Sequence, residues 1–147
     1  MKTLRSAAWL MVVGFVAAPC FAHHMAVIVS PGNSVQDVSS AELGKIFRTE
    51  TKKWPSGRSI TVVVHRASTG EAVTMERLNK MSAREWQSWV AEHQDLVKLV
   101  DSDEEALSYV SSTPGAIGMI DVRSVTDRVK VVRVDGKLPL EDGYLSH

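Results

Sequence analysis

The segment from His65 to Glu71 has the residue types of an oxyanion-binding turn. A β-branched run ends at its first residue and a helical pattern follows its serine, so the chain passes from a strand into a helix. The first amides of a helix have no intrahelical acceptor, and the helix dipole favours negative charge there. Ser68 and Thr69 supply hydroxyl groups. Gly70 lets an anion approach the backbone and Arg66 adds a positive charge, so the segment predicts a site for a small oxyanion.

The same residues also fit a purely structural role. In a capping box, a serine accepts an amide hydrogen bond from the residue three positions later, and a glutamate at that position reaches back to the serine amide. Ser68 and Glu71 have this spacing, and the pattern also begins at three other serines: Ser39, Ser82 and Ser102. Because the pattern is common in this chain, spacing alone favours the structural role. A carboxylate of Glu71 in the first helical turn would also repel a bound phosphate.

A second candidate site consists of His23, His24 and Met25, which offer two imidazoles and a thioether. If a signal peptide is removed before His23, the new amino terminus joins them, and such a donor set suits copper. The alternative is a frayed terminus without metal, and it is favoured because chain ends are usually poorly ordered. We therefore expect no metal.

No motif of a catalytic site is found in the sequence. It has no Gly-x-Ser-x-Gly elbow, no Walker loop and no His-Glu-x-x-His pair. His65, His93 and His147 lie far apart, and none has a second metal ligand at a suitable spacing. His93 follows two tryptophans at helical spacing, which favours a packed imidazole over a ligand. We predict no catalytic residue, no cofactor and no enzymatic activity.

The first 22 residues predict export. Lys2 and Arg5 precede an apolar run from Ala7 to Ala18, and the tripeptide at 20–22 has small residues at its ends. Cleavage is expected after Ala22, which leaves residues 23–147 as one domain in the periplasm. A membrane anchor needs about 20 apolar residues, more than this run contains. Lipidation of the cysteine at position 20 is discounted because Pro19 precedes it, where lipoproteins have a small residue.

The exported chain is nearly neutral. Removal of residues 1–22 takes away two of the 17 basic residues, none of the 17 acidic residues and the only cysteine. The resulting net charge of about −2, without a basic run, argues against nucleic acid or an anionic membrane surface as the main partner. Without cysteine there is no disulfide framework, so a hydrophobic core must stabilise the fold.

Apolar patterns and turn residues predict alternating strands and helices. Strands are expected at 26–29, 59–65, 96–100, 116–120 and 129–134, and helices after the four serines of the capping boxes. The run at 59–65 is the clearest strand, because its β-branched residues suit a buried sheet position. The order β-α-β-α-α-β-α-β-β predicts one α/β domain, a mixed sheet flanked by helices.

Four motifs occur in a familiar order. They are Val-Ser-Ser-Ala-Glu-Leu-Gly-Lys-Ile-Phe at 38–47, Lys-Trp-Pro-Ser-Gly-Arg-Ser-Ile at 53–60, Val-His-Arg at 64–66 with its Ser-Thr-Gly turn, and Thr-Pro-Gly-Ala-Ile-Gly-Met at 113–119. Together they resemble the phosphate-binding-protein-like family, the type 2 periplasmic solute-binding proteins of ABC importers, and in particular its small single-lobe members. The resemblance extends from about Ala26 to Tyr144 and implies a single periplasmic-binding-protein-like lobe.

The resemblance implies phosphate binding in transport or sensing. In that family, the turn after the third motif holds phosphate through hydroxyls and helix amides, which places Ser68, Thr69 and Gly70 at the ligand with Arg66 beside them. The usual order is Ser-Gly-Thr, whereas this chain has Ser-Thr-Gly, and full-length members have two lobes that close on the ligand. The alternative is an accessory module that docks on an envelope sensor or transporter without binding a solute.

Overall fold

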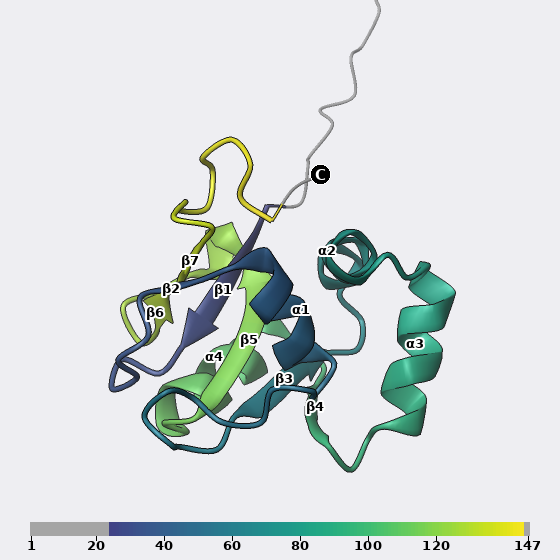
Figure 1. Cartoon of the computed structure of the whole chain (residues 1–147), viewed down its shortest axis with the longest axis horizontal. Helices are drawn as coiled ribbons and strands as arrows, with labels where there is room; N and C mark the ends of the chain where they lie inside the picture. Colours follow the sequence, from purple (N-terminus) through teal and green to yellow (C-terminus); the bar gives the residue numbers. More distant parts are fainter. Residues whose placement is uncertain (1–23, 146–147) are drawn as a thin grey trace, which may run out of the picture.

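A five-stranded mixed sheet organises residues 24–145, the part of the chain that the computed structural model describes (Figure 1). The strand order is β4-β3-β5-β1-β6, and β3 (Thr61–His65) runs parallel to both β4 (Val97–Val100) and β5 (Ala116–Asp121). β1 (Met25–Val29) is antiparallel to β5 and to β6 (Lys130–Val131). β2 (Asp37–Val38) and β7 (Arg133–Val134) form a separate parallel pair. The predicted α/β fold with a mixed sheet is confirmed.

The interior strand β3, between β4 and β5, has one hydrophobic cluster on each of its faces. Val62 and Val64 belong to one cluster and Val63 to the other, and each is at most 2% exposed. Alternate residues of a strand point to opposite faces, so a strand in the middle of a covered sheet must be apolar on both sides. The strand predicted at 59–65 is thus confirmed as β3, which begins two residues later, at Thr61.

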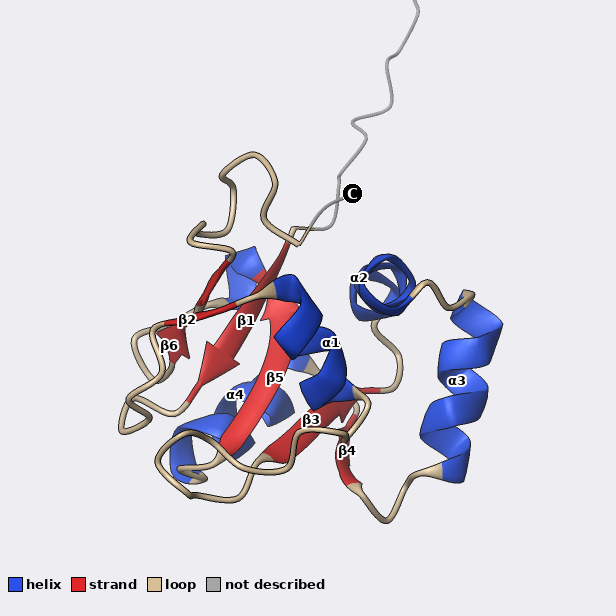
Figure 2. Cartoon of the chain, in the orientation of Figure 1, coloured by secondary structure: helices blue, strands red, loops and turns tan. Residues whose placement is uncertain are grey.

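Helices cover both faces of the sheet (Figure 2). α1 (Ser40–Phe47) and α2 (Thr69–Asn79) contribute to the first cluster, whereas α4 (Asp103–Ser112) packs on the opposite face in the second. α3 (Ala83–Glu92) packs against α2 and stands at the side of the molecule, beyond the edge of the sheet (Figure 1). The four predicted helices are all present, each with its serine as N-cap: Ser39, Ser68, Ser82 and Ser102.

The apolar face of α3 holds a stack of three rings. Trp86 and Trp89 stack with centroids 5.2 Å apart, and Trp89 and His93 stack at 4.2 Å. His93 also lies 2.7 Å through Nδ1 from the carbonyl oxygen of Trp89. The expectation of a packed histidine at this position is confirmed.

Two of the sequence motifs meet in the structure. The indole Nε1 of Trp54 donates a buried hydrogen bond of 3.0 Å to the carbonyl oxygen of Gly115. A Cβ on Gly115 would lie 2.1 Å from the carbonyl oxygen of Ser59, so only glycine fits there. The Trp-Pro turn and the Pro-Gly-Ala-Ile-Gly segment thus form one packing unit at the amino-terminal ends of β3 and β5.

The carboxyl-terminal segment differs from its prediction in one respect. The expected strand 129–134 is two short strands, because the chain changes partner at Val132: Val132 N donates to Val27 of β1, and Arg133 N donates to Gln36, next to β2. The hydroxyl of Tyr144 closes the junction, accepting from Val27 N and donating to the carbonyl of Val132. β2 itself has only two residues, too few for a sequence pattern.

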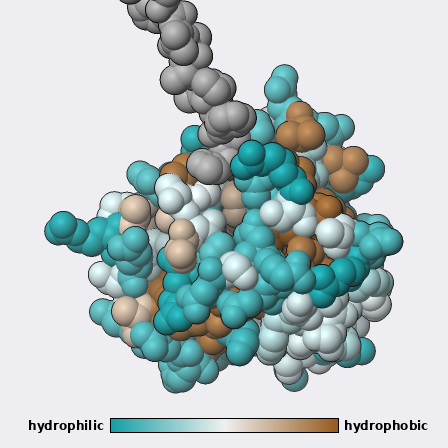
Figure 3. Space-filling model, turned by 180° about the vertical axis from the view of Figure 1, so that it is seen from behind, coloured by the Kyte–Doolittle hydropathy of each residue, from teal (hydrophilic) through white to brown (hydrophobic). Residues whose placement is uncertain are grey.

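The predicted signal peptide at 1–22, with its cysteine, lies outside the described residues. Between residues 24 and 145, no helix combines the length and hydrophobicity that a bilayer crossing requires. Seen from behind, most of the surface is hydrophilic and apolar residues form separate patches (Figure 3).

Candidate functional site

The passage from β3 to α2 forms a helix start at the carboxyl edge of the parallel strands. His65 ends β3, its carbonyl accepts from Ser68 N at 3.1 Å, and Ser68 is the N-cap of α2. The Ser68 hydroxyl accepts from Glu71 N at 3.0 Å, which leaves its own proton available for a further acceptor. The amides of Thr69 and Gly70, in the first turn, have no acceptor among the described residues.

Three of the four predicted site residues face a common space. Arg66, Ser68 and Thr69 line a cavity of about 440 Å³ between α2, α3 and the sheet. Gly70 is buried behind them and does not line this cavity. The structure thus brings these residues together, and a role in ligand binding stays a prediction.

The charge of Arg66 is already balanced. Its Nε and Nη2 donate to the carboxylate of Asp101 at distances of 2.8 to 3.0 Å, in a bidentate pair. Both side chains are about half exposed, so solvent screens the pair and a competing anion can reach the guanidinium. Arg66 is therefore a partly neutralised cation beside the helix start.

Glu71 occupies a different place from the one that the capping-box pattern predicts. Its side chain is only 1% exposed, and Oε2 accepts from the amide of His65 at 3.1 Å instead of that of Ser68. Oε1 is buried and has no partner among the described residues. Burial raises the pKa of Glu71 to about 8; the His65 hydrogen bond opposes this and the charge of Asp103 adds to it. The carboxyl is thus mostly neutral at pH 7 and does not repel an anion at the helix start.

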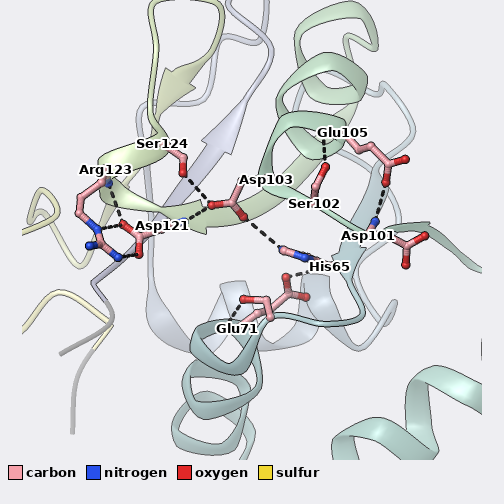
Figure 4. A network of polar contacts seen from close by, with 10 residues as sticks. His65, Glu71, Asp101, Ser102, Asp103, Glu105, Asp121, Arg123 and Ser124 are labelled. Atoms are coloured by element: carbon pink, nitrogen blue, oxygen red, sulfur yellow. Dashed lines mark hydrogen bonds and ion pairs between the residues drawn. The ribbon is translucent and has the colours of Figure 1, made fainter. Parts of the chain in front are cut away.

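A polar network joins the carboxyl ends of β3 and β5 to the start of α4 (Figure 4). Asp103 Oδ1 lies 3.2 Å from His65 Nδ1, and Asp103 Oδ2 accepts from Asp121 N at 3.2 Å and from Ser124 Oγ at 2.8 Å. Sequence reasoning missed this network, because His65 and Asp103 are 38 positions apart. The only available signal was topological: parallel strands end at the same edge of a sheet.

The polar side chains of this edge pair with one another. Ser124 donates to Asp103 and not to the imidazole of His65, so it lacks the adjacent base that activates a nucleophile. Among residues 24–145, no group of three or more histidine, cysteine, aspartate or glutamate side chains is placed to hold a metal ion. Asp121 is paired with Arg123, as Asp101 is with Arg66, so the edge has no strong excess of positive charge.

The alternative copper site loses one of its three candidate ligands. Met25 is the first residue of β1 and its side chain is 5% exposed within the first core cluster. His24 is exposed, and His23 lies outside the described residues. A thioether packed in the core cannot join an exposed imidazole at one metal ion without disrupting that end of the strand.

Solved structures share this fold. An ABC-type phosphate transport receptor from Vibrio cholerae matches with a TM-score of 0.67 and 24% identity, over 79% of this chain and 48% of its own. A putative phosphate ABC transporter substrate-binding protein from Clostridium perfringens, with bound phosphate, matches with a TM-score of 0.59 and 22% identity, over 77% and 45%. PstS from Borrelia burgdorferi matches with a TM-score of 0.57 and 18% identity, over 79% and 49%.

These matches confirm the predicted resemblance at the level of the fold. The chain spans about half the length of the solved structures that it matches. No protein-family model and no curated protein sequence matches the chain.

Proposed function

We propose that the protein is a non-enzymatic solute-binding lobe that binds a small oxyanion, with phosphate as the first candidate, in the periplasm and in the service of an ABC importer. The observation that carries the proposal is the start of α2, where the amides of Thr69 and Gly70 lack acceptors among the described residues. The hydroxyl of Ser68 and the guanidinium of Arg66 stand beside them on the cavity wall. The fold that this chain shares with phosphate receptors supports the choice of ligand.

The affinity expected from one lobe is low. Each hydrogen bond to a charged group contributes about 1.5 to 3 kcal/mol, and a ligand held from one side makes fewer of them. Water also reaches the open side and weakens each charge interaction. We therefore expect a dissociation constant on the order of 1 mM for phosphate, unless a partner covers the site.

Calorimetric titration of the purified protein with phosphate and sulfate tests the proposal. Ser68→Ala removes a hydroxyl donor at the proposed site, so its heat of phosphate binding is expected to fall to the level of buffer. Ser82→Ala is the matched control, because it removes the N-cap of α3, whose exposed serine does not line the cavity. It is expected to bind phosphate as the wild type does.

A second test breaks the pair of Arg66 and Asp101 and looks for a higher affinity for phosphate. Asp101→Asn weakens the bidentate pair and removes a negative charge, which frees the guanidinium for the anion. Phosphate affinity is expected to rise by about three- to tenfold. An unchanged or weaker affinity would count against Arg66 as a ligand contact.

The alternative predicted from the sequence, an accessory module that docks on an envelope protein, predicts a different result. Phosphate and sulfate would then give no heat with either the wild type or Asp101→Asn. The pairing of Arg66 with Asp101, which partly neutralises the cation of the proposed site, is the observation that favours this alternative.

A further inference from the structure

The cavity beside α2 is lined mostly by apolar side chains, and His65, Gln87 and Gln94 add polar groups to its wall. Val64 and Leu99 line it from β3 and β4, and Trp86 and Val90 line it from α3. α2 contributes only residues of its N-cap and first turns, which are Ser68, Thr69, Ala72 and Val73. The apolar space therefore adjoins the end of α2 where the amides of Thr69 and Gly70 have no acceptor within residues 24–145, and the rest of that helix lies away from it.

The cavity is too large for an inorganic ion alone. Its volume of about 440 Å³ lies in the range of roughly 300 to 1,000 Å³ that small-molecule sites have, whereas phosphate has only five heavy atoms. Water against the valine, leucine and tryptophan walls finds few hydrogen-bond partners. An apolar group that displaces this water gains free energy from the hydrophobic effect.

The charges at the cavity favour one anionic head group. Among the described residues that line it, Arg66 is the one arginine or lysine and none carries a carboxylate, and Asp101, outside the lining, already pairs with Arg66. A ligand with two separated anionic groups would leave one of them in the apolar interior, which is costly. A ligand with one anionic head group and an uncharged body fits the site, because the head group can lie at the helix start and the body against the apolar walls.

We propose that the cavity between α2 and α3 binds the apolar body of a small organic oxyanion, such as an aryl or short alkyl phosphonate or phosphate ester. Its head group lies at Ser68 and Thr69, and its body lies between Trp86 and Leu99. This inference rests on the proposed oxyanion site and specifies an organic oxyanion as the preferred ligand of that site.

Calorimetry with phenylphosphonate, inorganic phosphate and benzyl alcohol tests this ligand class on the purified protein. Phenylphosphonate is expected to bind at least tenfold more tightly than phosphate, because its ring enters the cavity. Benzyl alcohol lacks the anionic head and is expected to give no measurable heat. Equal affinities for phenylphosphonate and phosphate would overturn the inference and leave the phosphate site standing. No heat with either anion would refute the proposed function itself.

A substitution that fills the apolar part of the cavity tests the binding of the ligand's body separately from that of its head group. Ala91 is an exposed residue of α3 that lines the cavity, so Ala91→Trp places an indole in the space without disturbing the core. The Ala91→Trp variant is expected to bind phenylphosphonate at least tenfold more weakly than the wild type does, with the same affinity as for inorganic phosphate. Its affinity for phosphate is expected to be unchanged. Ser88→Trp is the matched control, since Ser88 is exposed on the same helix and does not line the cavity.

Two further outcomes complete the test. Ser68→Ala is expected to weaken phenylphosphonate and phosphate together, because both use the same head-group site. If Ala91→Trp binds phenylphosphonate as tightly as Ser88→Trp does, the apolar body does not occupy this cavity and the inference is wrong. Thermal unfolding of both variants verifies that they are folded.

Discussion

The starts of α2 and α3 share the pattern Ser-x-x-Glu and differ in structure. At α3, Ser82 accepts from Glu85 N and Glu85 accepts from Ser82 N, so the box is closed on the exposed surface. At α2, Ser68 accepts from Glu71 N, but the buried carboxyl of Glu71 accepts from His65 N, the last residue of β3. The same four-residue pattern thus gives a surface cap in one place and a buried carboxyl in the other.

The difference comes from what precedes each helix. α3 follows another helix through a short turn, and Glu85 accepts from its own N-cap, Ser82. α2 follows the interior strand β3, whose last amide lies at the carboxyl edge of the sheet. Glu71 reaches that amide and leaves the Ser68 amide bonded to the carbonyl of His65. Context within the sheet, more than the local pattern, decides where the glutamate points.

The largest expected effect is the pH dependence that Glu71 imposes on stability. Its pKa is about 8 in the folded protein against an ordinary value of 4.5, so between these values the folded state holds a proton that the unfolded state releases. The contribution of this group to the free energy of unfolding therefore decreases as the pH rises from about 4.5 to 8, by an amount on the order of 5 kcal/mol. Urea unfolding of the wild type at pH 5, 6.5 and 8 measures it.

Glu71→Gln isolates this contribution. The glutamine amide oxygen can still accept from His65 N, and the side chain cannot ionise. We expect the variant to lack the decrease and to be more stable than the wild type at pH 8. Glu85→Gln, at the closed box, is expected to follow the wild-type profile. Parallel profiles for wild type and Glu71→Gln would mean that Glu71 ionises normally in the folded state.

The second effect compares the two serine caps. Ser82→Ala removes an exposed cap and is expected to cost about 1 kcal/mol of unfolding free energy. Ser68→Ala leaves the partly buried amide of Glu71 without its acceptor, so we expect a loss of about 2 kcal/mol. Ser68→Thr keeps the hydroxyl and is expected to restore most of this loss. Equal losses at the two serines would show that water replaces the cap equally well at both.

Most of the fold could be predicted from the sequence, because its signals are local. Each helix begins at a serine whose side chain accepts from the amide three residues later, and β3 is a β-branched run buried on both faces. The order of strands and helices followed from these signals. β2 could not be predicted, since its two residues pair with β7 through contacts 96 positions apart, between Asp37 and Arg133.

The candidate site was predictable only in part. Arg66, Ser68 and Thr69 are consecutive or nearly so, and the sequence places them at one helix start. Three other features depend on tertiary contacts: the pairing of Arg66 with Asp101, the burial of Glu71 and the cavity that α3 lines. The sequence shows the acidic residues at 101–105 but not that β4 brings them beside β3.

The smallest expected effect is at the closed box itself. Glu85→Ala leaves the exposed amide of Ser82 without its acceptor, and water can take that place, so we expect a loss of only about 0.5 kcal/mol of unfolding free energy. Part of this loss is the attraction between the carboxylate and the helix dipole, which salt screens. Glu85→Gln keeps the hydrogen bond and loses the charge, so at low salt it is expected to lie between Glu85→Ala and the wild type. In 0.5 M NaCl the Debye length is roughly half of that in physiological salt, so the carboxylate is screened from the helix dipole. Glu85→Gln is then expected to be as stable as the wild type. A difference in stability that persists at this salt concentration would mean that the loss comes from the geometry of the hydrogen bond and not from the charge.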